Sequence, residues 1–139
     1  MLHASHRLAP DPGSIVLGRR VIAELPIGAA PKALAKLAAS ELITNALEHA
    51  GLGRTDVIEL RTEVGDAQVR VSVCDPGPGP SRRMRPGLGL KVVERAADRW
   101  GVDRGAELTC FWFEIDLDAG LGPGGDLQRG DRPAHGLAS

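Results

Sequence analysis

The spacing of apolar residues switches along this chain from a helical period to the alternation of β-strands, and this switch restricts the fold. Gly51 follows a long helical pattern as a C-terminal stop, and Gly65 and Asp66 suit a hairpin turn between two alternating segments. The expected helices are 15–25, 31–50 and 90–99, and the expected strands are 57–63, 68–74, 100–102 and 108–117. Helices on one face of a mixed, mostly antiparallel sheet form an α+β two-layer sandwich, which is the fold that we expect.

Length and composition indicate a single domain and argue against some classes of binding partner. The chain has 139 residues, and we expect a loose arm over 1–13, a folded domain over 14–118 and a disordered tail over 119–139, which is rich in Gly, Pro and Asp. The formal net charge is −1 and the basic residues are scattered, so neither nucleic acid nor an anionic membrane is an expected partner. No segment approaches the roughly 18 consecutive apolar residues of a membrane span.

The two cysteines, Cys74 and Cys110, lie in apolar strand-like segments without metal-ligand spacing. No secretory leader precedes them, and disulfides are rare in the cytoplasm. We therefore expect two reduced core residues in a cytoplasmic protein.

The second expected helix carries a stripe that changes from apolar to polar. The apolar part is Leu34, Leu37 and Ala38, and the same line continues through Glu41, Asn45 and His49. Burying a carboxylate and an amide without partners costs several kcal/mol, so these side chains would face a cavity with a ligand, a metal or water. The alternative is a helix whose far end simply emerges from the core into solvent.

Two glycine-containing segments follow strands or precede helices. Asp75-Pro76-Gly77-Pro78-Gly79-Pro80 follows the alternating strand, where glycine lets the backbone turn sharply beside a ligand, although the same residues also suit an ordinary turn. Gly87-Leu88-Gly89 precedes the third expected helix, where free backbone N–H groups suit phosphate oxygens, although a tight loop explains it equally. The order of the three segments is more specific than any one of them.

In that order, E-x-x-x-N on a helix, D-x-G-x-G after a strand and G-x-G-L into a helix resemble the GHKL ATPases, whose pocket has the Bergerat fold. This superfamily includes DNA gyrase, MutL, histidine-kinase catalytic domains and anti-sigma factor kinases. The helix sequence E-L-I-T-N-A-L-E-H-A over 41–50 is most similar to that of the stand-alone anti-sigma factor serine kinases. The resemblance covers roughly residues 8–118.

The resemblance implies a site for ATP and Mg²⁺. Asn45 would coordinate magnesium, Glu41 would be the general base, and Asp75 would accept a hydrogen bond from the adenine amino group, where guanine presents a carbonyl. The other implied nucleotide-binding residues are Gly77 and Gly79 at the adenine, Gly87, Leu88 and Gly89 at the phosphates, His49 on the phosphate side and Thr109 at the adenine edge. Because the register of the last strand is ambiguous by one residue, Cys110 is an alternative to Thr109.

The function that the resemblance implies is a cytoplasmic anti-sigma factor. It would bind a sigma factor, phosphorylate a serine of a STAS-type antagonist and, like many family members, form a homodimer. Only residues 81–86 separate the two glycine segments, which is a short ATP lid, although Arg82, Arg83 and Arg85 could contact the triphosphate or form solvated surface. The short lid favours a second hypothesis, a non-catalytic ATP-sensing interaction module. A third is a plain α+β scaffold with fortuitous motifs.

Overall fold

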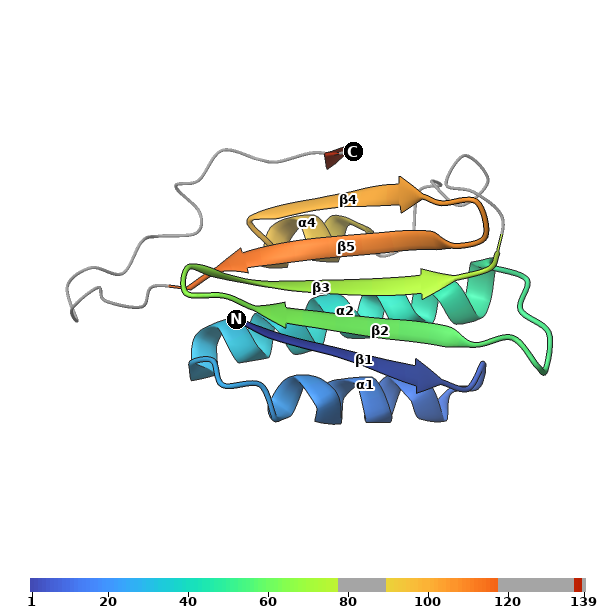
Figure 1. Cartoon of the computed structure of the whole chain (residues 1–139), viewed down its shortest axis with the longest axis horizontal. Coiled ribbons are helices and arrows are strands. Elements are labelled where there is room, and N and C mark those ends of the chain that lie inside the picture. The colour runs from blue at the N-terminus through green and yellow to red at the C-terminus, as the bar shows by residue number, and fades with distance from the viewer. Residues whose placement is uncertain (78–89, 118–136, 139) are drawn as a thin grey trace.

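The computed structural model describes residues 1–77, 90–117 and 137–138, which form one sheet with the helices on one of its faces (Figure 1). The strands are β1 Leu2–Leu8, β2 Ile58–Val64, β3 Gln68–Asp75, β4 Arg99–Arg104, β5 Thr109–Asp116 and β6 Leu137–Ala138. The described helices are α1 Gly13–Ala23, α2 Ala29–His49 and α4 Leu90–Ala96. The predicted α+β two-layer sandwich is confirmed.

The strands lie in the order β1-β2-β3-β5-β4-β6, and neighbours are antiparallel except β4 and the two-residue β6, which are parallel. The predicted hairpin between β2 and β3 is confirmed, with the Gly65 N–H donating to the Gln68 carbonyl at 2.9 Å. Gly51 has a φ of 66° after α2, as predicted for a left-handed helix stop. The central strand β3 pairs with β2 along one edge and with β5 along the other, so its position is fixed by two neighbouring strands.

The core lies between the helices and one face of the sheet. Alternate residues of the strands point into it, and they are Ile58, Leu60, Val64, Val69, Val71, Val73, Trp100, Val102, Phe111, Phe113 and Ile115. Helix α1 approaches α2 closely: a Cβ added to Gly18 of α1 would lie 2.4 Å from Cδ1 of Ile43. A larger residue at this position would therefore force the end of the Ile43 side chain to move.

The apolar stripe predicted for α2 is partly wrong. Ala38 is buried and Leu34 is partly buried, but Leu37 is 45 % exposed. The buried face consists instead of Ala35, Ala38, Ala39, Leu42, Ile43, Asn45 and Ala46. A helix that packs against the sheet, α1 and α4 buries a wide face, and small alanines fill close contacts that a leucine would not fit.

Residues 2–8 form the edge strand β1 and are not the loose arm that the sequence suggested. The whole strand pairs with β2, from Leu2 opposite Val64 to Leu8 opposite Ile58. All but Leu8 are exposed, so the strand is held by backbone pairing and shows little of the apolar alternation on which the prediction depended. Of the tail predicted to be disordered, Leu137 and Ala138 form β6, and the rest lies outside the described residues.

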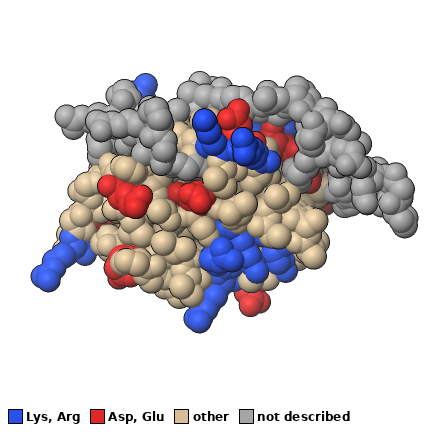
Figure 2. All heavy atoms as spheres, turned by 180° about the vertical axis from the view of Figure 1, so that it is seen from behind, with Lys and Arg blue, Asp and Glu red and all other residues tan. Residues whose placement is uncertain are grey.

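Charged side chains on the helix-covered side lie in small groups of either sign, separated by wide uncharged areas (Figure 2). None of the helices in the described segments is long and apolar enough to cross a lipid bilayer.

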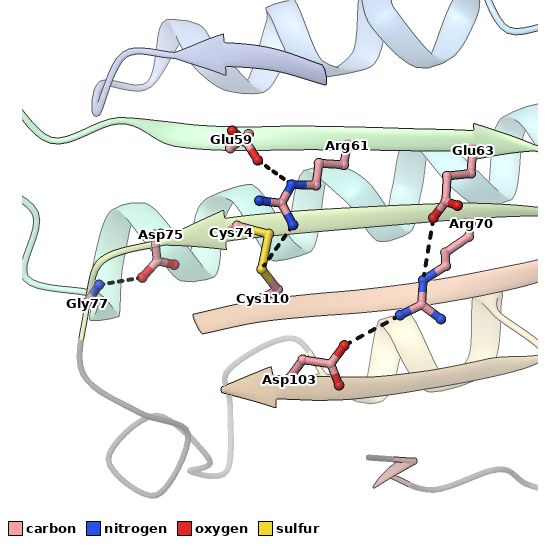
Figure 3. Close-up of a disulfide and its surroundings, with 9 residues drawn as sticks. All are labelled: Glu59, Arg61, Glu63, Arg70, Cys74, Asp75, Gly77, Asp103 and Cys110. Carbon is pink, nitrogen blue, oxygen red and sulfur yellow. Dashed lines mark hydrogen bonds and ion pairs between the residues drawn. A yellow bond between two sulfur atoms is a disulfide. The ribbon is translucent and has the colours of Figure 1, made fainter. Parts of the chain in front are cut away.

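Cys74 and Cys110 form a disulfide, so the prediction of two reduced cysteines is wrong (Figure 3). The two residues face each other on adjacent antiparallel strands, β3 and β5, with their Cα atoms 4.0 Å apart. Their side chains leave the sheet on the face away from the helices, since the alternate residues Val73 and Phe111 point into the core. The cysteines are 36 residues apart in sequence, and only the pairing of β3 with β5 makes them neighbours.

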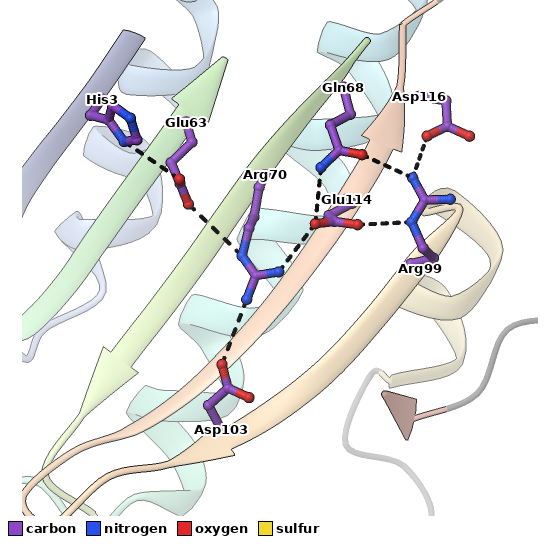
Figure 4. Close-up of polar contacts among 8 residues, drawn as sticks. All are labelled: His3, Glu63, Gln68, Arg70, Arg99, Asp103, Glu114 and Asp116. Atoms are coloured by element: carbon purple, nitrogen blue, oxygen red, sulfur yellow. Dashed lines mark hydrogen bonds and ion pairs between the residues drawn. The ribbon is translucent and has the colours of Figure 1, made fainter. Parts of the chain in front are cut away.

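The face of the sheet away from the helices carries a network of ion pairs (Figure 4). Arg70 stacks on the ring of Trp112 at 4.0 Å and reaches Glu114 at 3.1 Å. Arg99 pairs with Glu114 at 2.8 Å and with Asp116, and the hydrogen bonds to Asp116 and then Glu114 raise the pKa of its guanidinium. These pairs join β3, β5 and β4 across their polar face.

The third predicted helix is shorter than expected because the residues that follow it are attached to β5. Helix α4 ends at Ala96, and Arg99 belongs to β4. Between them, the Asp98 N–H donates to the Glu114 carbonyl at 2.9 Å, and the Asp98 carboxylate accepts from the Asp116 N–H at 2.6 Å. The chain is thus attached to β5 two residues after the helix, which a local helical pattern cannot indicate.

Candidate nucleotide-binding site

Asn45 is a polar residue on the buried face of α2. It is 2 % exposed, and neither its Oδ1 nor its Nδ2 has a hydrogen-bond partner among the described residues. Buried amides in proteins are almost always hydrogen-bonded, since leaving one unpaired costs about 1–3 kcal/mol. The side chain therefore fits a bound group that coordinates its oxygen, and the alternative of a solvated helix end does not apply to Asn45.

Asp75 and Thr109 end the core-facing rows of β3 and β5. They are directly opposite each other in the register, and Asp75 is fully buried while Thr109 is 5 % exposed. The carboxylate Oδ1 of Asp75 accepts a hydrogen bond from the Gly77 N–H at 2.8 Å, which fixes its orientation (Figure 3). A carboxylate and a hydroxyl thus lie side by side where the apolar core ends.

The register also separates the two candidates for the position next to Asp75. Thr109 shares the core face with Asp75, whereas Cys110 leaves β5 on the opposite face and is bonded to Cys74. Because successive side chains of a strand point to opposite faces, only Thr109 can be on the same side as Asp75.

Gly77 brings the segment after β3 against the end of α2. A Cβ at this glycine would lie 2.5 Å from the carbonyl oxygen of Ala50 and 2.6 Å from its Cβ. Ala50 immediately follows α2, little more than one helical turn after Asn45. The contact places the Asp75 segment beside the helix that carries Asn45. Ala50 was not singled out in the sequence, although a small residue at a helix end opposite a glycine is the signal for such a contact.

Glu41 and His49 are less buried than Asn45. Glu41 lies one helical turn before Asn45 and is partly buried. His49, the last residue of α2, is exposed, with its Nε2 3.8 Å from the Glu48 carboxylate. The polar line predicted along α2 therefore has one fully buried member, and the proposed role of His49 at the phosphates stays a prediction.

Four of the predicted nucleotide-binding residues, Gly79, Gly87, Leu88 and Gly89, lie outside the described residues, as do the arginines of the short lid. The described part resumes at Leu90, the first residue of α4, and α4 packs against α2. The chain that follows the second glycine segment thus returns to the helix of Asn45.

A groove of about 790 Å³ lies elsewhere, between β1 and α1. Its lining is largely apolar, with Leu8, Leu17, Val21 and Leu25. None of the predicted site residues contributes to it, so it is not the site that the sequence motifs describe.

Replacing Gly77 by alanine is expected to displace the Asp75 segment from α2, because the added methyl group would overlap the backbone of Ala50. We expect a loss of about 1–3 kcal/mol in the free energy of unfolding, measured by chemical denaturation. Gly53→Ala is the control, because the nearest atom to a Cβ there is 3.6 Å away. Equal stability of the two variants would contradict the close contact.

Comparison with known proteins identifies the family and the fold of this chain. Residues 8–115 match the model of the family described as the histidine kinase-like ATPase domain. Among solved structures, the chain is similar to the RsbU and RsbW domains of Rv1364c from Mycobacterium tuberculosis, with a TM-score of 0.67 and 22% sequence identity. That match covers 84% of this chain and 33% of the other, so the chain spans about a third of the length of that protein.

No curated protein matches the chain. The family model nevertheless extends from the end of β1 to β5. It includes Glu41 and Asn45 of α2 and Asp75 at the end of β3. The chain belongs to the histidine kinase-like ATPase domain family.

Proposed function

We propose that this protein is a cytoplasmic anti-sigma regulatory factor that binds ATP with Mg²⁺ and phosphorylates a serine of a STAS-type antagonist. The observation that carries the proposal is the buried Asn45 amide, which has no partner among the described residues and lies one turn after Glu41. The similarity of segment 41–50 to anti-sigma factor serine kinases supports this specific function within the family. A sigma factor and a second copy of the chain are the further proposed partners.

The proposed roles follow from the chemistry of each side chain. Asn45 would offer its amide oxygen to Mg²⁺, a hard cation that commonly has few protein ligands and is otherwise held by phosphate oxygens and water. Asp75, oriented by the Gly77 N–H, would accept a hydrogen bond from the adenine amino group, and Thr109 beside it would bind the same edge. Glu41 would take the proton of the attacking serine hydroxyl or water.

A second candidate function is an ATP-sensing interaction module without phosphotransfer. The observation that favours it is the short ATP lid, since only residues 81–86 separate the two glycine segments. A short lid offers less protection of the γ-phosphate from water, and phosphoryl transfer depends largely on such positioning. Both candidate functions require nucleotide binding, and only the first requires phosphotransfer. Binding and phosphotransfer are therefore tested separately.

Asn45→Ala is expected to abolish magnesium-dependent nucleotide binding while leaving the nucleotide-free protein at least as stable. The substitution removes a metal ligand, and it also removes a buried amide that has no partner among the described residues. The measurement is the thermal shift caused by ATP, with magnesium and with EDTA. The neighbouring Thr44→Ala is the control, and a normal magnesium-dependent shift in Asn45→Ala would refute the metal assignment.

Asp75→Asn is expected to reduce the preference for ATP over GTP by about tenfold or more, because an amide can donate to the guanine carbonyl as well as accept from adenine. Isothermal titration with both nucleotides measures the ratio. Asp66→Asn, in the exposed turn between β2 and β3, should behave like the unmodified protein. A full preference for ATP in Asp75→Asn would refute the adenine contact.

Glu41→Gln is expected to lower phosphotransfer roughly 10²- to 10⁴-fold, the usual contribution of a general base, with little change in ATP affinity. The assay is transfer of labelled γ-phosphate to a STAS-type protein from the same source organism. Glu48→Gln is the matched control, because Glu48 is on the same helix with its side chain 63% exposed. ATP binding without transfer by the unmodified protein would favour the interaction module.

A further inference from the structure

We propose that the Cys74–Cys110 disulfide is a reversible thiol–disulfide site whose oxidation state sets the affinity of the nucleotide site. This inference rests on the proposed nucleotide-binding function. It starts from the register of β3 and β5, in which the disulfide pair is directly followed by the Asp75–Thr109 pair. The same two strand ends thus carry the disulfide on one face and the proposed adenine contacts on the other.

The disulfide holds these two strand ends closely together. The Cα atoms of Cys74 and Cys110 are 4.0 Å apart, whereas facing residues of antiparallel strands are usually about 4.5–5.5 Å apart. Two thiols need more room than a sulfur–sulfur bond, so reduction allows this end of the β3–β5 pair to widen. The adjacent Asp75 and Thr109 would then lose part of their fixed separation.

One of the two cysteines is partly exposed on the polar face of the sheet. Cys74 is fully buried, but Cys110 is partly exposed and lines a cavity of about 550 Å³. A low-molecular-weight thiol can therefore approach Cys110. The guanidinium of Arg61, with Nη1 4.0 Å from the Cys110 Sγ, favours a thiolate at this sulfur when the bond is broken (Figure 3). Glu59 pairs with the same guanidinium and moderates this effect.

The reaction is thiol–disulfide exchange with a low-molecular-weight thiol. Its thiolate attacks the Cys110 Sγ, the Cys74–Cys110 bond breaks, and Cys74 leaves as a thiolate that takes a proton from solvent. A second thiolate attacks the external sulfur of the mixed disulfide and releases Cys110. In sum, one protein disulfide and two thiols give two protein thiols and one small disulfide, and the reverse reaction reforms the bond.

The oxidised form is the one with the higher affinity for ATP. Its strand ends are already fixed, so less conformational freedom is lost when Asp75 and Thr109 contact the adenine. In the reduced form this ordering accompanies binding and weakens it. We expect a difference of roughly fivefold in Kd, at the low end of the usual coupling between two sites.

The test uses the full chain, oxidised with oxidised glutathione or reduced with dithiothreitol, after removal of the reagent. Titration of free thiols verifies the two states, and isothermal titration gives the Kd for ATP with Mg²⁺ in each. A Kd roughly fivefold higher in the reduced protein supports the inference. An equal Kd, a lower Kd in the reduced protein, or two free thiols remaining after oxidation overturns it.

Two variants control for effects of the reagents. The double variant Cys74→Ala/Cys110→Ala should have one Kd under both treatments, close to that of the reduced protein. Cys110→Ser alone should do the same and leaves the buried Cys74 in place, so it serves if the double variant does not fold. A redox-dependent Kd in either variant overturns the inference. If neither redox state binds ATP, the proposed function and this inference are rejected together, whereas equal binding by the two states rejects the inference alone.

Discussion

The proposed nucleotide site depends on polar side chains that are buried between α2 and the sheet, at the place where the apolar core ends. Asn45 on the helix and Asp75 and Thr109 on the strands are all nearly or fully inaccessible to solvent. Polar groups in such positions destabilise a fold unless they are hydrogen-bonded or bind something. The apolar core itself extends from Leu8 of β1 to Val102 of β4 and includes the alanines of α2. The α2–sheet interface is thus apolar along most of its length and carries these buried polar side chains toward one end.

Close approach of backbone segments is the second requirement. Gly18 allows α1 to contact Ile43, and Gly77 allows the segment after β3 to contact Ala50. Both contacts fix a neighbour of α2, one near its middle and one at its end. The contact at Gly77 is the one that places the Asp75 segment beside α2.

Most of the fold could be predicted from the sequence because its signals are local. Helices α1 and α2, the hairpin of β2 and β3, and the turn at Gly51 all follow from apolar spacing and turn residues. The roles predicted for Asn45 and Asp75 came from the order of the motifs and stay predictions, while the structure shows that both residues are buried. Features that depend on strand pairing could not be predicted. The edge strand β1 lacks apolar alternation, and the disulfide requires the register of β3 with β5.

The exposure of Leu37 and the short α4 have the same explanation. An apolar residue on a helix is buried only if another element lies opposite, and a helix stops early if its continuation is held by a strand. In α4 that strand is β5, through Asp98 and Arg99. Tertiary contacts outweigh local preference at both positions.

The place of β1 at the end of the sheet bears on how the protein can be handled. Its first residues are exposed, but its backbone covers the edge of β2, and Leu8 belongs to the core. Trimming the first eight residues as a dispensable leader would uncover a row of backbone N–H and C=O groups along β2, which is a template for unwanted strand addition and aggregation. Purification tags are accordingly better joined to an intact N-terminus through a flexible spacer than substituted for it.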